Sequence, residues 1–248
     1  MLALFSNRQS ALTTKNDLAA TAGRCYHSDS FTYRRLNIKM NATTNLQLNP
    51  YAVQLCTLSR WISAKQWAPA GSGNFSIRSN EHSCLITRAH KDKGELSPHD
   101  LVQISWSCGE AEFASDASAS ALLHVALYQQ FPTAKVVLQT QSVAANVWSR
   151  LIKADHYLFS GYELQSVITK QPAQQQSCSL AIIDANQPKP LQATEISRRA
   201  SELNSGLLIR GHGLYVWGES LEHSKRQLEA WEFLISCELE RMKITALL

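Results

Sequence analysis

A chain of 248 residues, 44% of them hydrophobic and 18% charged, can bury the core of one large domain or of one domain with an extension. Its formal net charge of +4 is small and its basic residues are scattered, which argues against a nucleic-acid partner. No apolar run approaches the roughly 20 residues that cross a bilayer, so we expect no membrane segment and a cytoplasmic location.

The first 47 residues differ in composition from the rest of the chain. They are rich in Ser, Thr, Ala and Asn, and their basic residues outnumber Asp17 and Asp29. Two interpretations stay open: a transit-like segment, or an upstream start codon with Met40 as the first residue of the real product. Both make residues 1–47 an N-terminal extension without a fold of its own, and residues 48–248 the folded domain.

One helix and a series of short strands are predicted in the first half of the domain. Pro50 opens a segment with apolar residues at helical spacing, and this helix must end before Pro69. A turn follows at 71–74, where the sequence reads Gly-Ser-Gly-Asn. The β-type runs between polar loops are Phe75–Arg78, Cys84–Thr87 and Leu101–Trp106.

Helices alternate with strands in the second half. The stretch 115–118 can cap a helix running from Leu122 to Phe131, where Pro132 ends it. The later predicted elements are a strand at Lys135–Leu138, a helix at Val143–Leu151, a strand at Leu180–Ile183, a helix at Thr194–Leu203, a strand at Gly206–Arg210 and a helix at Glu219–Met242. This mixture predicts an α/β fold, a three-layer α/β/α sandwich.

The six cysteines form no Cys-x-x-Cys pair and no tight framework, so we expect reduced thiols. They are Cys25, Cys56, Cys84, Cys108, Cys178 and Cys237.

Motifs distributed over about residues 50–245 match one known family in their order. They lie at 69–76, 85–87, 91–94, 121–132, 142–145, 161–163 and 210–218. Together they resemble the class II aldolase/adducin family, and within it they are most similar to the methylthioribulose-1-phosphate dehydratases, metal-dependent lyases of methionine salvage. The resemblance implies the fold of that family. It also implies a homo-oligomer, usually a tetramer, with sites near subunit interfaces.

In such enzymes three histidines hold a zinc ion that polarises the substrate carbonyl, and a glutamate handles the proton. A Gly-Asn turn, a Ser-Gly pair and a serine ahead of the glutamate cradle the phosphate. On this sequence the resemblance leaves Gly73, Asn74 and Ser118 as the phosphate-binding remnant. It leaves His212 as the metal-binding remnant.

The remaining parts of that machinery are changed here. Gln139 and Gln141 stand at two ligand positions, and Ser120 stands at the glutamate position. A serine hydroxyl cannot act as a base without an activator of its own. Ala89 and His90 stand where the Ser-Gly pair would hold phosphate. No catalytic residue of the family is therefore intact.

The prediction that zinc is lost rests on strand geometry and ligand chemistry. Residues i and i+2 of a strand project to one face, so imidazoles at 139 and 141 would converge on an ion together with His212. A glutamine amide is neutral and a poor zinc ligand. Disturbing an outer partner of a metal site already costs about 10- to 100-fold. We therefore expect no zinc and no other cofactor.

Several polar residues have two interpretations. Gln139 and Gln141 either line a remodelled polar pocket or keep a vestigial cavity hydrated. His212 is interpreted either as a former ligand or as a histidine that hydrogen-bonds within a tight Gly-His-Gly turn, and we expect a former ligand position that now has a structural role. We interpret His124 as a core histidine, and His90, beside Lys91 and Lys93, as part of a solvated loop rather than an anion site. The last helix is expected to make core or oligomer contacts.

Three functions follow from these patterns. In the first, the chain is a catalytically silent family member that keeps the fold for binding or assembly. In the second, it is an active methylthioribulose-1-phosphate dehydratase with altered metal ligation. In the third, it is a subunit that binds a small molecule of the sugar-phosphate kind in the remodelled pocket. The first is the prediction, and the second is its alternative.

Overall fold

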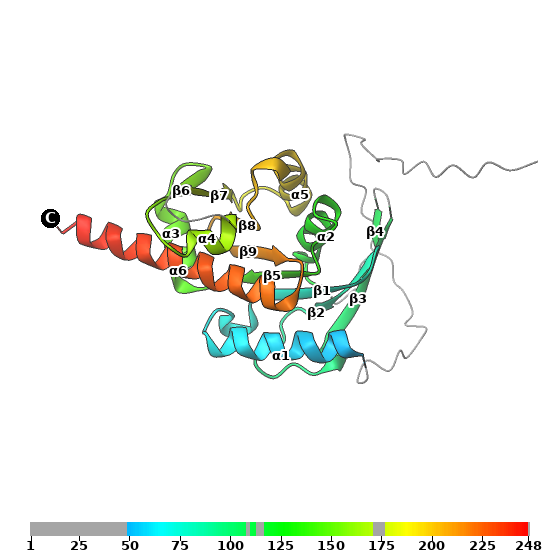
Figure 1. The fold of residues 1–248 in the computed structure, drawn as a ribbon. Helices are drawn as coiled ribbons and strands as arrows, with labels where there is room; N and C mark the ends of the chain where they lie inside the picture. The colour runs from blue at the N-terminus through cyan, green and yellow to red at the C-terminus, as the bar shows by residue number, and fades with distance from the viewer. Residues whose placement is uncertain (1–48, 108–109, 113–116, 171–176, 248) are drawn as a thin grey trace, which may run out of the picture. The chain divides into compact units, whose positions relative to one another are not determined.

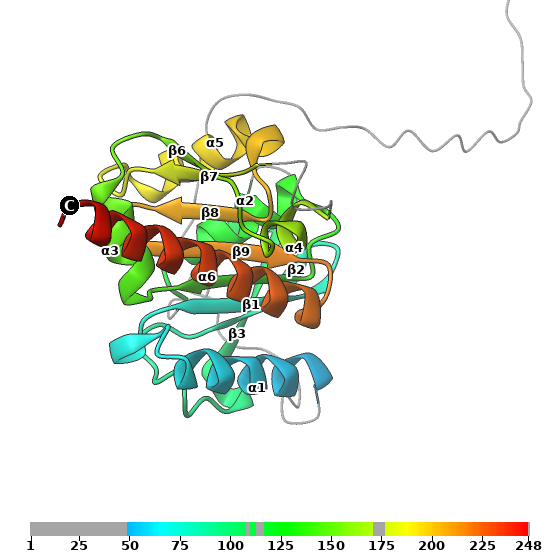
Figure 2. The ribbon, with the colours of Figure 1, turned by 60° about the vertical axis from the view of Figure 1, so that its left-hand side comes forward.

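The computed structural model describes residues 49–107, 110–112, 117–170 and 177–247. The predicted extension at residues 1–47 lies outside these ranges. The described residues form a nine-stranded sheet with helices on both faces (Figures 1 and 2). This arrangement confirms the predicted three-layer α/β/α architecture.

The sheet has the strand order β4-β3-β2-β1-β5-β9-β8-β7-β6. Neighbouring strands are antiparallel except β7 and β8, which are parallel. The strands are β1 (Asn74–Asn80), β2 (Ser83–Thr87), β3 (Leu101–Ser107), β4 (Glu110–Glu112), β5 (Val136–Thr140), β6 (His156–Phe159), β7 (Cys178–Ile183), β8 (Gly206–Ile209) and β9 (Gly213–Gly218). The pair β5 and β9 lies in the middle of the sheet.

Each face of the sheet has its own apolar core. One core packs under α1 (Pro50–Ala64), α3 (Val143–Leu151), α4 (Gln165–Thr169) and α6 (Leu221–Thr245). The other packs under α2 (Ala121–Gln130) and α5 (Lys189–Arg198). In Figure 2, α6 runs across the strands on the first face. Within α6, Trp231 is fully buried and Phe233 is 48% exposed.

Local sequence accounts for where several helices begin. The side chain of Asn49 accepts a hydrogen bond from the Tyr51 N–H at 2.9 Å, and Pro50 occupies the first turn of α1. In the same way, Ser142 accepts from the Ala145 N–H at the start of α3. The predicted helix after Pro50, with its end before Pro69, is confirmed.

Some predicted boundaries were wrong. The helix predicted at Thr194–Leu203 begins at Lys189 and ends at Arg198, and a separate short 3-10 helix follows at Ala200–Glu202. Prolines are tolerated in a first helical turn, so the two that flank Lys189 do not delay the helix. The predicted cap at 115–118 lies partly outside the described residues. In its described part, the Ser118 carbonyl accepts from the Ala121 N–H at 2.9 Å, but the residue that precedes α2 is Ser120, which makes no side-chain cap hydrogen bond.

The sequence patterns missed four elements: β4, β6, β9 and α4. Within the described residues, no helix is long and apolar enough to cross a membrane. Four of the six cysteines lie in that part of the chain, and all four are free thiols, as predicted: Cys56, Cys84, Cys178 and Cys237.

Candidate functional site

The turn between β8 and β9 brings His212 next to the end of β5. In the β5–β9 register, Gln139 lies opposite Tyr215 and Thr140 opposite Leu214. Gly213 has a φ of +124°, and a Cβ there would lie 1.9 Å from the Thr140 carbonyl oxygen. Only glycine combines this backbone angle with so close an approach. Gly213 therefore allows the turn to lie directly against the position of Gln139.

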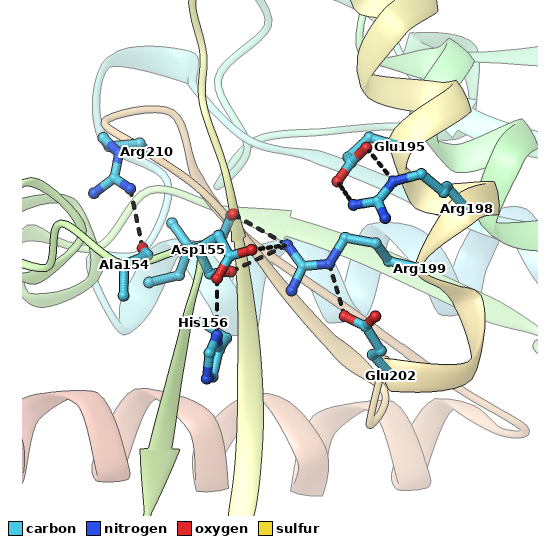
Figure 3. A network of polar contacts seen from close by, with 9 residues as sticks. Ala154, Asp155, His156, Glu195, Arg198, Arg199, Glu202 and Arg210 are labelled. Carbon is cyan, nitrogen blue, oxygen red and sulfur yellow. Dashed lines mark hydrogen bonds and ion pairs between the residues drawn. The ribbon is translucent and has the colours of Figure 1, made fainter.

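Arg210 fixes the same turn to the end of α3. Its guanidinium donates to the carbonyl oxygens of Ser149 at 2.6 Å and of Ala154 at 3.2 Å, and also to that of Ile152. Its Nε lies 2.7 Å from the Asp184 carboxylate. Figure 3 shows the contact between Arg210 and Ala154, beside a separate network around Arg199. This geometry suits the rigid fork of arginine and not a lysine.

Gln139 links the metal-site remnant to the phosphate-site remnant. It is 1% exposed, and its Nε2 donates to the His212 carbonyl at 3.0 Å. Its Oε1 accepts from Asn74 Nδ2 at 3.4 Å, and the same Nδ2 lies 3.3 Å from Ser118 Oγ. The structure therefore brings four of the predicted site residues together. Gly73 adjoins them, with a φ of +82°, and a Cβ there would lie 3.0 Å from the Gln139 carbonyl oxygen.

Gln141 is a predicted site residue that lies outside this chain of side-chain contacts. It lies just past the end of β5 and is half-buried. Its backbone N–H donates to the Trp67 carbonyl at 2.8 Å.

Three hydrogen-bonding groups surround Nε2 of His212. They are Tyr215 Oη at 3.3 Å, Ser120 Oγ at 3.4 Å and Lys189 Nζ at 3.4 Å. Burial, and then the positive charge of Lys189, lower the pKa of His212 to about 4. The ring is therefore neutral at pH 7 and a weak base. Burial also lowers the pKa of Lys189, and burial raises that of Tyr215.

The Ser120–His212 pair has the residue types of a nucleophile and its base, but not their properties. Ser120 is only 4% exposed, which shields its hydroxyl from an external substrate. The separation of 3.4 Å exceeds the usual hydrogen-bond reach of about 2.6–3.2 Å. An imidazole with a pKa near 4 is also poorly matched to general-base catalysis at neutral pH. The pair therefore gives no basis for a serine nucleophile.

The residues at the family's metal position do not fit a zinc ion. No group of three or more His, Cys, Asp or Glu side chains within the described ranges could hold a metal. Both ends of the Gln139 amide are already engaged with protein groups. Amides are also weak donors to zinc compared with imidazole, thiolate or carboxylate.

Lys189 opposes a cation at the same position. A zinc ion at the usual distance of about 2.1 Å from Nε2 would lie within about 5.5 Å of the Lys189 ammonium, given the 3.4 Å between the two nitrogens. The repulsion would be about 6 kcal/mol at an effective dielectric constant of 20, and less where water enters. A metal would have to displace this ammonium or deprotonate it.

Two other residues noted in the sequence have structural roles. His124 is fully buried, as the core interpretation predicted, with Nδ1 2.8 Å from Ser76 Oγ, and burial lowers its pKa to about 3. Lys93 is 1% exposed and donates to the carbonyls of Gly71 and Lys91, both at 2.8 Å. His90 is exposed on its loop. Its φ of +57° is a conformation that favours the glycine of the family pattern.

Sequence reasoning missed two residues. Lys189 stands between two prolines at the start of α5, a pattern that fixes the backbone but does not reveal where the side chain points. Glu232 of α6 is buried, and its carboxylate accepts from Thr140 at 3.1 Å and from Ser142 at 2.6 Å. Its only sequence signal is a carboxylate within an apolar stretch of the last helix.

Comparisons with known proteins agree with this architecture. The family model described as class II aldolase and adducin N-terminal domain matches residues 53–239. A methylthioribulose-1-phosphate dehydratase from Citrobacter koseri is 37% identical over 207 residues, 83% of this chain and 100% of that protein. A methylthioribulose-1-phosphate dehydratase from an Enterobacter species is 39% identical over 199 residues, which cover 79% of this chain and 96% of that protein.

Solved structures show the same fold at lower identity. A putative aldolase/epimerase/decarboxylase from Escherichia coli aligns with a TM-score of 0.63 and 21% identity, covering 75% of this chain and 86% of that one. L-fuculose-1-phosphate aldolase from Thermus thermophilus aligns with a TM-score of 0.61 and 18% identity, covering 80% and 98%. The matched family model, the dehydratase relatives and the shared fold together show that this chain belongs to the class II aldolase/adducin family.

Proposed function

We propose that this chain keeps the fold of its family, has lost the zinc-dependent dehydratase chemistry, and acts as a binding or assembly protein. The observation that carries the proposal is the set of side chains around His212. Amide groups stand at 139 and 141, the Gln139 amide is engaged at both ends, and the Lys189 ammonium lies 3.4 Å from Nε2. Such a set favours an uncharged or anionic occupant over a divalent cation.

The position of the family's proton-transfer group supports the same proposal. Ser120 stands there, buried beside a histidine whose pKa is about 4. Neither group can accept a proton efficiently at neutral pH. The proposed loss of activity therefore involves both the zinc ion, which is the electrophile in the family's reaction, and the side chain that accepts the proton.

A second candidate function is an active methylthioribulose-1-phosphate dehydratase with altered metal ligation. The observation in its favour is the identity of 37–39% to enzymes of that name over nearly their whole length. Asn74 and Ser118, which the resemblance assigns to phosphate binding, also lie in contact, with Asn74 Nδ2 3.3 Å from Ser118 Oγ. In this case a glutamine oxygen or a group from a partner subunit would have to complete the metal site.

Metal content and turnover separate the two candidates. The purified protein is analysed for bound metal, and its dehydration of methylthioribulose 1-phosphate is measured with added Zn²⁺, Mn²⁺, Fe²⁺ or Co²⁺. We expect far less than one ion per chain and no turnover. About one tightly held ion per chain together with turnover at enzyme-like rates would contradict the proposal and establish the second candidate.

Reverting the changed positions gives a positive control. The variant Ser120→Glu/Gln139→His/Gln141→His restores the family's residue types, and adding Lys189→Met removes the competing ammonium. We expect the fourfold variant to bind zinc more tightly than the threefold variant, because of the repulsion described above. If the wild type already dehydrates the substrate and the threefold variant has a similar rate, the metal ligands of the wild type are competent and the second candidate holds.

We also propose that the chain forms a homo-oligomer, by resemblance a tetramer. A stripe of exposed apolar residues on α3 supports this: Val143 is 76% exposed, Val147 42% and Leu151 51%. They recur every four residues and so lie on one helix face. Light scattering on the wild type and on Val147→Glu tests this, with a smaller mass expected for the variant. A monomeric wild type would contradict it.

A further inference from the structure

A cavity of about 510 Å³ lies beside the N-terminal ends of α1 and α6, on the face of the sheet that both helices cover (Figure 2). Its α1 wall runs from Tyr51 to Thr57, and the end of β1 and the start of β5 contribute residues 77–80 and 135–136. Two apolar side chains of the α1 wall are exposed, Tyr51 at 41% and Val53 at 48%. Exposed apolar side chains around a cavity favour an apolar occupant.

The charged residues around this cavity do not select a charged ligand. Arg78 and Lys135 carry positive charges, whereas Glu219 and Glu222 carry negative charges. Arg78 is also only 8% exposed, and its guanidinium donates to backbone carbonyl oxygens of the protein. Because the opposite charges balance, an uncharged occupant is the best electrostatic match.

The start of α1 shows one part of a common arrangement at helix N-termini. Asn49 is the N-cap, and its side chain accepts from the Tyr51 N–H at 2.9 Å. In a hydrophobic staple, the residue before the N-cap packs against the fourth residue of the helix. With Pro50 as the first helical residue, those two positions are Leu48 and Val53. The exposed apolar side chain of the cavity wall is therefore the one that a staple would cover.

We propose that residues 44–48, which lie outside the described ranges, occupy this cavity, with Leu48 against Val53 and Leu46 beside it. Residues 41–48 contain no charged side chain, which matches the balanced charges of the cavity. Leu46 and Leu48 alternate with polar residues, so an extended chain presents both leucines to the same side. The folded domain then begins a few residues before Asn49.

The position of the chain favours its own segment over other occupants. The segment joins α1 at Asn49, directly before the cavity wall that begins at Tyr51. From Tyr51 to Thr57 the helix rises about 9 Å, which about three extended residues span. A segment tethered so closely has an effective concentration of about millimolar. A second copy of the chain or another protein would have to compete with it.

Thiol accessibility in the full-length protein tests the proposal. Single cysteines are introduced as Leu46→Cys, Gln47→Cys, Leu48→Cys and Leu36→Cys, and their alkylation rates are read by peptide mass spectrometry, which separates them from the native thiols. We expect Leu46→Cys and Leu48→Cys to react about tenfold or more slowly than Leu36→Cys. Gln47→Cys, whose side chain points away from the cavity, should react at a rate close to that of Leu36→Cys.

A second substitution shows whether the cavity causes this protection. Adding Val53→Glu to Leu48→Cys places a charge in the cavity wall and should restore fast alkylation. Adding Leu191→Glu is the matched control, because Leu191 is an exposed apolar residue of α5, and it should leave the protection unchanged. If Val53→Glu unfolds the domain, Val53→Ser replaces it with the same expected direction.

The contrary outcomes are equally defined. Equal rates at positions 36, 47 and 48 overturn the inference, as does protection of Leu48→Cys that Val53→Glu leaves unchanged. Protection that is lost on about hundredfold dilution would mean that a second copy fills the cavity, and this also overturns it.

This inference does not depend on the proposed function. The cavity contacts β5 at Lys135 and Val136, whereas the His212 site lies toward the other end of that strand, at Gln139. Bound zinc and turnover in the wild type would contradict the proposed function and leave the alkylation pattern as expected.

Discussion

The buried carboxyl group of Glu232 should give this protein a pH-dependent stability. Glu232 is 3% exposed, and burial raises its pKa from 4.5 to about 7, although hydrogen bonds from Ser142 and Thr140 act in the opposite direction. Between these two pH values the folded state binds more protons than the unfolded state. The free energy of unfolding therefore falls as pH rises through this window and is constant above it.

The magnitude follows from the difference between the two pKa values. A shift from 4.5 to about 7 corresponds to about 3 kcal/mol, of which about 2.5 kcal/mol should be lost between pH 5 and pH 8. Glu232→Gln keeps the size of the side chain and removes the titration. The variant should therefore gain stability relative to the wild type by about that amount over this range.

Urea denaturation of wild type and Glu232→Gln at pH 5, 6, 7 and 8 measures the effect. His124 and His212 titrate in the opposite direction: their folded-state pKa values of about 3 and 4 make stability rise with pH up to about 6.5. Their contributions are common to both proteins and cancel in the difference between wild type and variant.

A second glutamate in the same helix provides the control. Glu238 is 5% exposed, and although burial opposes it, hydrogen bonds from Arg241, Tyr157 and Tyr162 lower its pKa below 4.5. It is therefore ionised in both states from pH 5 to pH 8, and Glu238→Gln should change stability by a constant amount. A constant difference for Glu232→Gln as well would refute the reasoning.

Five further variants, of which Gly211→Ala and Ala89→Gly are controls, test the turn at His212 and the loop at residues 89–90. Gly213→Ala should lose more than about 3 kcal/mol of unfolding free energy, because its Cβ would meet the Thr140 carbonyl at 1.9 Å. The control Gly211→Ala should lower the unfolding free energy by about 1–2 kcal/mol, because Gly211 has a φ of +65° but only Arg150 near the position of an added Cβ. Equal losses for Gly213→Ala and Gly211→Ala would show that the close approach to the Thr140 carbonyl does not matter. His90→Gly should raise the unfolding free energy by up to about 1 kcal/mol, because glycine relieves the left-handed strain at φ +57°. The control Ala89→Gly should lower the unfolding free energy by about 0.5–1 kcal/mol. A clear loss of stability for His90→Gly in chemical denaturation would contradict this. Arg210→Lys should lower the unfolding free energy by about 2 kcal/mol or more, because the carbonyl contacts of the guanidinium are lost. It should also speed hydrogen exchange at the Gly211 N–H, which donates to Ser149 Oγ at 2.9 Å. Unchanged exchange would mean that the guanidinium does not hold the turn.

The fold was largely predictable because local signals agreed along the chain. Pro50 and Asn49 start α1, apolar β-type runs mark β1 and β2, and Ser142 caps α3. The errors occurred where local signals were weak or conflicting. The predicted start of α5 at Thr194 was five residues too late, because the helix begins at Lys189 with Pro190 in its first turn. The strand β9 carries conflicting signals, because Tyr215, Val216 and Trp217 favour a strand whereas the glycines at both its ends favour turns.

The sequence by itself determined the family, the layered α/β architecture and the residue types at 120, 139, 141 and 212. The family follows from the resemblance of motifs in their order along the chain, and the architecture follows from hydrophobic periodicity that is local to each segment. The tertiary structure alone decided that Lys189 of α5 approaches His212 and that Glu232 of α6 reaches Thr140 and Ser142. Each contact joins segments separated by 23 to 92 positions, and their meeting depends on the order of strands in the sheet and on how helices pack across it. Side-chain charge and burial at such meetings are set by the assembled neighbours, which no single segment specifies.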